Sequence, residues 1–469
     1  MRKYLIALIS VLFFLLLPNC VLAAESSVFT KEATNVATSY RKQNINVQDE
    51  GVLLFSAKTY NGKYGNQLTG NAKKMYKELV NYYYTKQKTG TLKLTSNASV
   101  TFKVKFKGGE PDESTTDYRK AAEKLSNDFL YATEAFQEDY PEVFWLNYLD
   151  FSCGITVYKD KSYSTGYRGV LKVKTIYPSK DKEFPGEYFK DASKKIKDYN
   201  NGVKKAVASI KKQINHKNSR LSIYLGIHDY VCSKASYHTK AENASEKDSL
   251  KYMYASTSAN LFLSKPYKNE RKLLCDGYAK SFKVLCDAFG LDDSCVTIVG
   301  NTAEGLHEWN YVKINSKWYL IDTTWDDQGK QIYDTYLLAG QNSIGYDGVS
   351  IKKERKAYPY FSYPICKFTL PKLASNYYNV NEKITPVLKF KSTSVTKKYS
   401  KKLTFTNKLT RKETDGKITY RSSNKKIATV NEKTGKVTVV GKGKVTITAT
   451  AKAGKSYRKG SKKYTLIVK

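Results

Sequence analysis

The most constraining feature of this 469-residue chain is the order and spacing of three short segments around Cys275, His307 and Asp322. Cys275 stands before a segment in which large apolar side chains recur every three or four residues, which predicts a helix over 276–289. His307 and Asp322 flank two runs rich in aromatic and β-branched residues with a polar turn between them, which predicts a hairpin. Folding that hairpin brings the two side chains within about two cross-strand positions of each other. We therefore expect a helix packed against antiparallel strands.

These three residue types suit nucleophilic catalysis by a thiol. The thiolate is the reactive form of cysteine, and both a helix N-terminus and a nearby imidazolium lower the pKa of a thiol. We therefore expect a lowered pKa for Cys275. Gly277, in the first turn, keeps the helix narrow enough for a substrate carbonyl to approach. A carboxylate at Asp322 holds the His307 ring in one tautomer and leaves its other nitrogen for the thiol.

The segment 219–345 resembles the transglutaminase-like core domain of the papain-like thiol superfamily. Five blocks in the order of that family carry the resemblance: Ile227-His-Asp-Tyr230, Cys275-Asp-Gly-Tyr-Ala279, His307-Glu-Trp-Asn310, Trp318-Tyr-Leu-Ile-Asp322 with Thr324-Trp-Asp-Asp327, and Tyr333-Asp-Thr-Tyr-Leu-Leu338. The resemblance implies that Cys275 is the nucleophile, His307 the base and Asp322 the residue that orients the base. It also implies a helix-borne cysteine packed against an antiparallel sheet. Glu308 is a departure, because the family often has a small residue there.

The whole chain is expected to be a multidomain α+β protein with an all-β C-terminal domain. The expected segments are a signal peptide at 1–23, an N-terminal α+β region at 24–184, a basic connecting helix at 185–218, the core at 219–345, a linker at 346–386 and the C-terminal domain at 387–469. The N-terminal region carries no catalytic motif. Its expected role is to form one wall of a substrate groove or to pack against the core.

The segment 387–469 alternates apolar and polar residues in the manner of β-strands, most clearly over 436–440 and 444–449. This pattern resembles the bacterial group 2 immunoglobulin-like domain, which implies a β-sandwich. The segment carries 24 lysines and arginines against 3 acidic residues, a formal net charge of +21 out of +37 for the whole chain. We expect these cations at the outward positions of the strands.

Three explanations of this charge were weighed. A solvated, solubilising surface is the simplest. Nucleic-acid binding is disfavoured, because the chain is expected to be exported and carries no nucleic-acid motif. The preferred explanation is noncovalent attachment of 387–469 to an anionic polymer of the cell wall or to acidic phospholipid. Counterion release and screening would weaken that attachment as salt rises.

Residues 1–23 have the features of a secretory signal peptide. Met1-Arg-Lys3 is basic, 4–17 is an apolar run, and Ala23 is a small residue at the expected cleavage position. The apolar run is too short for a comfortable transmembrane helix. A lipoprotein signal that modifies Cys20 is the alternative, although Asn19 fits it poorly. No other stretch is long enough to span a bilayer. The mature protein is thus expected to be secreted or associated with the bacterial cell surface.

The other cysteines and histidines carry no motif. Six cysteines follow the expected cleavage site, an even number that suits disulfides, so Cys275 could be half of a cystine. Cys286 and Cys295 lie in apolar patterns and are expected in the core. The pairing of the remaining cysteines stays open: Cys153, Cys232 and Cys366. No metal-ligand spacing links the histidines and no calcium loop of spaced carboxylates occurs, so no cofactor or metal is expected.

Two further sets of residues have a functional and a structural explanation. Tyr237 or His238 could donate a hydrogen bond to an oxyanion. The alternative for His238 is that it is structural or exposed, as is expected for His216 and His228. Trp309 and Trp325 could line an acyl-donor groove, but core packing is the safer interpretation.

The function expected from these observations is secreted, thiol-dependent acyl transfer. Cys275 attacks the carbonyl of a glutamine side chain or a peptide bond in a protein or peptide substrate, and His307 protonates the leaving nitrogen. An amine then resolves the thioester to a crosslink, or water resolves it by deamidation or proteolysis. The alternatives are a cysteine protease or peptidoglycan amidase with the same triad, and a non-catalytic surface-binding protein. The last predicts a missing triad residue, and none is missing.

Overall fold

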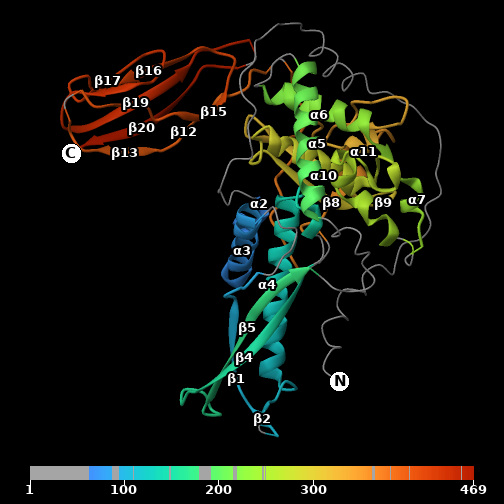
Figure 1. Cartoon of the computed structure of the whole chain (residues 1–469). Coiled ribbons are helices and arrows are strands. Elements are labelled where there is room, and N and C mark those ends of the chain that lie inside the picture. The colour runs from blue at the N-terminus through green and yellow to red at the C-terminus, as the bar shows by residue number, and fades with distance from the viewer. Residues whose placement is uncertain are drawn as a thin grey trace.

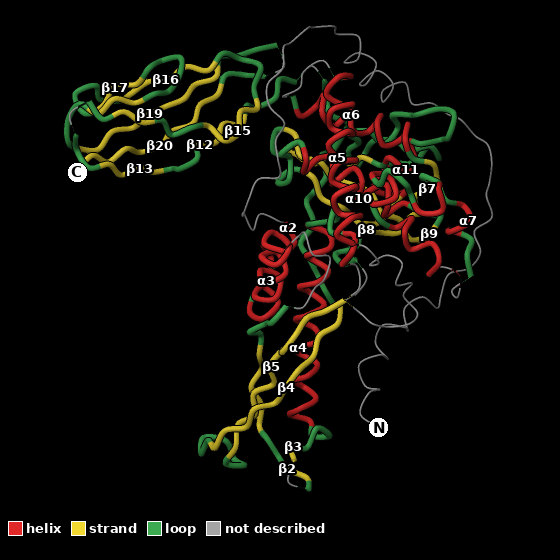
Figure 2. Tube along the Cα trace, viewed as in Figure 1, coloured by secondary structure: helices red, strands yellow, loops and turns green. Residues whose placement is uncertain are grey.

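The computed structural model describes the greater part of the chain after residue 62. The described residues are 63–86, 94–108, 110–146, 149–178, 192–214, 219–245, 248, 250–361, 365–380, 382–400, 402–455 and 457–469. The expected signal peptide and Cys20 lie outside them. Figures 1 and 2 show a helix-rich body, an elongated arm below it and a separate β domain. No helix of the described chain is both long and apolar enough to cross a bilayer.

The arm is built from the N-terminal region. Its elements are α2 (Lys63–Gln67), α3 (Gly70–Lys86), β1 (Ser99–Lys103), β2 (Phe106–Lys107), β3 (Glu110–Pro111), α4 (Thr116–Asp139), η1 (Phe144–Leu146), β4 (Leu149–Lys159) and β5 (Tyr167–Pro178). The strands form an antiparallel sheet in the order β1-β5-β4, and α4 lies along it (Figure 2). Thr115 begins α4 by accepting the Tyr118 N–H on its side chain. Helices α3 and α4 together with this sheet give the mixed α+β structure expected for the N-terminal region.

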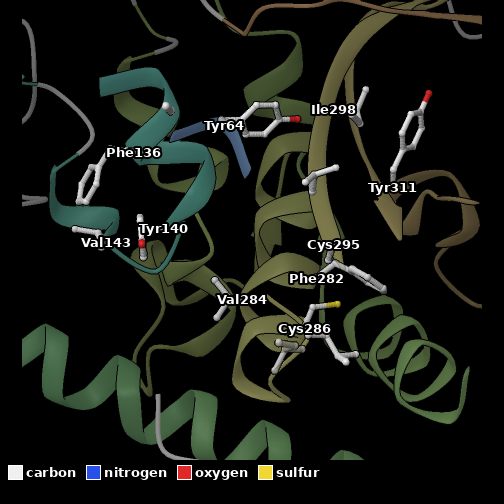
Figure 3. Packing of buried hydrophobic residues seen from close by; sticks show 14 of the residues in the cluster. Tyr64, Phe136, Tyr140, Val143, Phe282, Val284, Cys286, Cys295, Ile298 and Tyr311 are labelled. Atoms are coloured by element: carbon white, nitrogen blue, oxygen red, sulfur yellow. The ribbon is translucent and has the colours of Figure 1, made fainter. Parts of the chain in front are cut away.

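The base of the arm shares one hydrophobic core with the body. Tyr64 donates its hydroxyl to the carbonyl of Thr297, and the Thr297 hydroxyl donates to Glu138 at 2.6 Å. Figure 3 shows Tyr64 and Phe136 across from Ile298 in this core. The N-terminal region therefore packs directly against the sheet of the body.

The body is a four-stranded antiparallel sheet in the order β10-β9-β8-β11 with helices against it. Its elements are α5 (Ala192–Gln213), α6 (Arg220–Lys234), β6 (Ser236–Tyr237), α7 (Thr239–Glu242), η3 (Leu250–Ser256), α9 (Ala259–Phe262), η4 (Tyr267–Asn269), β7 (Lys272–Leu273), α10 (Cys275–Ala288), β8 (Cys295–Thr302), β9 (Gly305–Ile314), β10 (Lys317–Ile321), α11 (Thr323–Asp326), α12 (Ile351–Glu354) and β11 (Arg355–Ala357). Helix α10 packs on β8 and β9. The expected basic helix corresponds to α5, and Cys286 and Cys295 are buried in the core.

Residues 346–386 are not a linker, contrary to the expectation from the sequence. Strand β11 pairs with β8 and so completes the sheet of the body. Further along, Phe368 and Tyr378 are buried in the common core, and the N–H of Ala374 donates to the carbonyl of Trp318. This segment has few long apolar runs, so it resembled a linker, but its scattered aromatic side chains bury themselves against the strands.

The C-terminal domain is the expected all-β sandwich. Its strands are β12 (Val387–Phe390), β13 (Ser394–Lys397), β14 (Thr404–Phe405), β15 (Leu409–Glu413), β16 (Ile418–Ser422), β17 (Ala428–Val430), β18 (Val437–Val439), β19 (Gly443–Ala451) and β20 (Gly460–Val468). A four-stranded sheet, β13-β20-β19-β16, faces a second layer formed by β12-β15 and β14-β18-β17. Alternate residues such as Val445, Ile447 and Leu466 fill the space between them.

The sandwich is docked on the body through a buried ion pair. Arg220, the first residue of α6, donates from Nε to Glu413 Oε2 of β15 at 2.5 Å and from Nη1 to Ser294 at 2.7 Å. The Tyr457 hydroxyl of the sandwich accepts the Arg220 backbone N–H at 3.2 Å. Because Arg220 is buried, losing its partner would leave an uncompensated charge. The orientation of the two parts is therefore defined by specific contacts.

Candidate active site

His307 and Asp322 form a buried hydrogen-bonded pair. His307 lies on β9, and Asp322 follows the last residue of β10, Ile321, which pairs with Asn310. His307 Nε2 donates to Asp322 Oδ2 at 2.8 Å. The two strands are joined by a tight turn at Asn315 and Ser316, both with positive φ. This register puts the two side chains on the same face of the hairpin, which leaves His307 Nδ1 as the ring nitrogen available to a thiol.

Asp322 is held in place through both carboxylate oxygens. Oδ1 accepts the backbone N–H groups of Thr324 and Trp325 at 3.1 and 3.2 Å and so caps the short helix α11. Oδ2 accepts from His307 and from Arg355 Nη1, each at 2.8 Å. Burial raises the pKa of Asp322, but His307 and Arg355 outweigh burial, so its pKa lies well below the usual range. An ionised carboxylate therefore faces the imidazole.

Arg355 is a residue of this site that the sequence did not predict. It is the first residue of β11 and is buried, with Nε donating to Glu354 Oε1 at 2.8 Å. Its guanidinium lies over the rings of Trp325 and Trp309, 4.5 and 5.1 Å from their centroids. No local motif marks Arg355, because it lies 33 residues after Asp322 in the segment interpreted as a linker. The sequence shows only an arginine directly after an acidic residue, Glu354, which does not distinguish Arg355 from other basic residues.

The two tryptophans surround the His307 ring. Trp325 stacks beside His307 with 5.1 Å between ring centroids, and Trp309 lies 6.0 Å away. Trp309 is buried, in agreement with its interpretation as a core residue, whereas Trp325 is only partly buried. The rings restrict the motion of the imidazole and exclude water from one side of it.

Cys275 is the first residue of α10, as expected, but the electrostatics around its thiol differ from expectation. Burial raises its pKa well above the ordinary value, and the carboxylates of Asp276 and Glu308 raise it further, despite opposing hydrogen bonds from the backbone N–H groups of Glu308 and Asp276. The helix N-terminus thus does not dominate, and the resting thiol is neutral. Among the described residues no hydrogen bond joins this thiol to His307, although α10, which begins with Cys275, packs on the strand that carries His307.

Two carboxyl groups, the buried Glu308 and the partly buried Asp276, act on the Cys275 thiol. Glu308 Oε2 and Asp276 Oδ2 are both 4.0 Å from Lys280 Nζ, and the buried Glu308 Oε1 has no hydrogen-bond partner in the described structure. Burial raises the pKa of Glu308 well above its usual range, and Glu138 and Asp276 add to that effect while Lys280 opposes it. Glu308 therefore loses its proton less readily than an exposed glutamate.

The other candidates at this end of the body have structural contacts. Strand β6 pairs with β7 just before Cys275, so Tyr237 lies beside Leu273, and its hydroxyl donates to Glu242 at 3.2 Å. His238 accepts the Ala241 N–H on Nδ1 and caps α7. His238 is thus a structural residue.

His228 forms a second buried contact with an aspartate. It lies 3.1 Å from Asp326 through Nε2 and 3.1 Å from Asp229 through Nδ1. Although burial lowers its pKa, the two carboxylates raise it to about 10, so the ring is an imidazolium that supports the chain after Asp322. His228, Asp229 and Asp334 offer ligand atoms within 4.8 Å of one another. Since both ring nitrogens already bond to carboxylates, this group is better explained as an ion-pair network than as a metal site.

All six cysteines of the described chain are free. Cys275 is accordingly a thiol in this structure and not half of a cystine. Cys232 donates to the Thr323 carbonyl at 3.4 Å and packs under α11. The exposed cysteine is Cys153, on the arm.

Comparisons with known proteins agree with this division of the chain. Residues 385–460 match the profile of the family described as bacterial Ig-like domain (group 2). Over 118 residues the chain is 29% identical to the Kyphoscoliosis peptidase of Mus musculus, which covers 23% of this chain and 15% of that protein. The chain therefore spans only a small part of this curated relative.

Two solved structures are similar to parts of this chain at low sequence identity. One is a crystal structure of a TGase, 16% identical over 50% of this chain and 52% of that chain, with a TM-score of 0.21. The other is a proposed cysteine protease from Cytophaga hutchinsonii, 14% identical over 37% of this chain and 65% of that one, with a TM-score of 0.19. The protein thus combines a mixed helix-and-strand part with a C-terminal segment that matches the bacterial Ig-like domain (group 2), and over 118 residues it is similar to a peptidase.

Proposed function

We propose that the protein is a thiol-dependent acyl transferase that acts on glutamine carboxamides or peptide bonds of a protein or peptide substrate. The observation that carries the proposal is the buried His307–Asp322 pair, 2.8 Å apart, at the strand β9 against which the helix that begins with Cys275 packs. A carboxylate, an imidazole and a helix-borne thiol are the components of a nucleophile with its base. Cys275 is the nucleophile, His307 the base and Asp322 the orienting residue.

The neutral resting thiol determines how the first step would run. The Cys275 S–H passes its proton to His307 Nδ1 as the sulfur attacks the substrate carbonyl. The C–N bond of the tetrahedral intermediate then breaks, and the imidazolium returns the proton to the leaving ammonia or amine. The remaining thioester is attacked by an amine or by water, with His307 again accepting the proton, and the thiol is restored. Asp322 stabilises the imidazolium in both halves of the cycle.

Acylation of Cys275 tests this proposal without knowledge of the natural substrate. The mature chain is mixed with the activated ester p-nitrophenyl acetate, and the acetylated cysteine is located by peptide mass spectrometry. We expect rapid acylation at Cys275, a loss of the burst in Cys275→Ala, and an unchanged burst in Cys153→Ala, which removes an exposed thiol far from the site. A burst that survives in Cys275→Ala would contradict the proposal.

A cysteine protease or amidase is the second candidate, supported by the similarity to a peptidase over 118 residues. The two outcomes differ in the product. With a glutamine-bearing peptide and an excess of a primary amine, a transferase releases ammonia and incorporates the amine, whereas a protease shortens the peptide. Mass spectrometry of the peptide after incubation with the wild-type chain and with Cys275→Ala distinguishes them.

The C-terminal domain would hold the secreted enzyme at the bacterial surface through its positive charge. The formal net charge of +21 on 387–469 supports this part of the proposal. Attachment of this kind is electrostatic, so it weakens as salt rises. Release of the protein from bacterial cells in a salt series tests it: retention that is unaffected by high salt would contradict electrostatic attachment.

A further inference from the structure

The outer face of the sheet β13-β20-β19-β16 carries a regular array of hydroxyl groups. The strand register places Thr446, Thr448 and Thr450 of β19 on the side opposite to the buried Val445, Ile447 and Ala449. Their cross-strand partners on β20 are Thr465, Lys463 and Ser461, respectively. We call this outward side of the four-stranded sheet the hydroxyl face. It is the side that the second layer of the sandwich does not cover.

Three cations stand among these hydroxyls. Arg421 of β16 and Lys463 of β20 lie on either side of Thr448, and Lys444 lies one alternate position before Thr446 on β19. All three are exposed. Adjacent strands are separated by about 4.8 Å, so each cation has hydroxyl groups within the reach of a single bound anion. The face thus offers both charge-assisted and neutral hydrogen-bond donors.

Acidic residues are absent from the described strands of this sheet. The segment 387–469 has three acidic residues, and none belongs to β13, β16, β19 or β20. Glu413 is engaged by Arg220 at the junction with the body, and Glu432 lies in the turn between β17 and β18 of the second layer. A polyanion can therefore approach the hydroxyl face without meeting a carboxylate from that sheet.

The chemistry of the face discriminates between kinds of anionic partner. At the outward positions used here, β16, β19 and β20 carry threonine, serine, lysine or arginine, with Ile467 as a half-buried exception. Insertion into a lipid surface relies on exposed aromatic and large apolar side chains, and binding of single-stranded nucleic acid relies on aromatic stacking. Neither type of side chain is presented by these positions. Hydroxyls and cations suit a polymer that alternates phosphates with hydroxylated units.

We propose that the hydroxyl face is the docking surface of the C-terminal domain for a phosphodiester-linked polyol polymer of the cell wall, with Arg421, Lys444 and Lys463 on the phosphates and the β19 threonines on the polyol hydroxyls. This assignment rests on the proposed surface retention and specifies the face and the polymer. The phosphates accept hydrogen bonds from the cations, whereas threonine hydroxyls can both donate to and accept from the polyol.

Binding of the full mature chain to immobilised poly(glycerol phosphate) tests the assignment. All proteins carry Cys275→Ala, so the result does not depend on the proposed catalysis. The test variant is the triple change Arg421→Gln, Lys444→Gln and Lys463→Gln. The matched control removes the same charge from the second layer and its turn, with Lys389→Gln, Lys433→Gln and Lys436→Gln, three exposed residues outside the face.

We expect the face triple to lower the affinity at 100 mM NaCl at least tenfold and the control triple to lower it less than threefold. The slope of log affinity against log salt should fall by about 2 in the face triple, since each lost phosphate contact removes roughly 0.7. A third variant, with Thr446, Thr448 and Thr450 each changed to valine, keeps the charge and strand propensity. It should weaken binding severalfold with the slope unchanged.

Three results would overturn the proposal. An equal loss of affinity in the face triple and the control triple would mean that net charge alone binds the polymer. An unchanged affinity in the threonine-to-valine variant would show that the threonine hydroxyls do not contribute to binding. Binding of the parent protein to phosphatidylglycerol vesicles or to single-stranded DNA that is as tight as binding to poly(glycerol phosphate) would assign the charge to a different partner. Thermal unfolding of each variant verifies that the sandwich is intact.

Discussion

The side chains on the two faces of strand β9 differ in how well their charges are paired. On one face, His307 and Trp309 lie against Asp322 and the Arg355 guanidinium, so that every charge has a close partner. On the other face, Glu308 lies among carboxyls with Lys280 at 4.0 Å and one buried oxygen unpaired. Successive residues of a strand point to opposite faces, so a step of one residue separates the two environments.

In the proposed mechanism, the base is therefore preorganised, whereas the nucleophile is not activated before the substrate binds. The His307 face keeps Asp322 ionised, whereas burial, with the carboxylates of Asp276 and Glu308, raises the pKa of Cys275. A thiol that stays neutral until substrate arrives is protected from oxidation and alkylation, because those reactions need the thiolate. The predictions below perturb one face at a time.

The largest effect is expected from Asp322→Asn on the His307 face. An amide cannot stabilise the imidazolium. Its NH₂ group would donate to His307 Nε2 and so favour the tautomer in which Nδ1 carries the proton and cannot act as the base. Acylation of Cys275 by p-nitrophenyl acetate should fall by about 10³–10⁴-fold. The control is Asp326→Asn, which alters the other buried histidine–aspartate contact. If both variants remain folded and lose activity equally, the assignment of His307 and Asp322 is wrong.

Arg355→Met should cost about 3–5 kcal/mol of unfolding free energy at pH 7, because it leaves buried carboxylates without their cation. Asp322 has a depressed folded pKa, so its contribution to stability is present above its unfolded pKa of about 3.9 and is lost as pH falls through the folded pKa. The difference between the wild type and the variant should therefore begin to narrow below about pH 4, with complete convergence only below the much lower folded pKa of Asp322. Urea unfolding from pH 3 to 8 measures this.

Arg168→Met is the matched control for that measurement. Arg168 pairs with Asp160 at 3.2 Å, but both side chains are about one-third exposed. An exposed pair contributes roughly 0–1 kcal/mol. If Arg355→Met lowers the free energy of unfolding no more than Arg168→Met does, the role of Arg355 in holding Asp322 is contradicted.

Glu308→Gln addresses the opposite face and should activate the thiol. The amide stays neutral at every pH, so the Cys275 thiolate forms without a neighbouring negative charge at this position. The midpoint of iodoacetamide labelling against pH should move down by about one unit, and labelling at pH 8.5 should rise up to about tenfold. Labelling of Cys153 in the same samples should not change. A midpoint that moves upward would show that Glu308 does not oppose the thiolate.

The smallest effect is expected from Tyr237→Phe, because Tyr237 lies beside Leu273, two residues before Cys275, and has a structural contact of its own. Its hydroxyl already donates to Glu242 at 3.2 Å. Acylation should therefore change less than about threefold. A loss of about 10²-fold or more would instead identify Tyr237 as a donor to the oxyanion. Tyr230→Phe, a neighbouring tyrosine on α6, serves as the control.

The local elements of the site were predictable because short-range patterns specify them. Apolar side chains at helical spacing gave the extent of α10 to within one residue, and the aromatic runs gave the hairpin of β9 and β10. Once the hairpin exists, the proximity of His307 and Asp322 follows from geometry alone. The alternation of 436–449 likewise predicted β18 and β19.

Contacts between segments distant in the sequence were not predictable. Arg355 reaches Asp322 only because β11 returns to pair with β8, and no pattern near 346–386 marks that return. The thiol pKa was expected from the helix N-terminus, a local feature, but burial and the carboxyls of Asp276 and Glu308 determine its direction. Electrostatic energy at a buried site depends on all neighbouring charges and on the exclusion of water, neither of which is local.

The sequence by itself determined which residues are available for chemistry, where the helix and hairpin that carry them begin, and that the C-terminal domain is a basic sandwich. Only the tertiary structure decided which charges Asp322 and Cys275 face and which lysines share a surface with threonines. The physical reason is range: hydrogen bonding and apolar periodicity act between near neighbours in the chain. Burial and charge pairing act across space and depend on how distant segments pack.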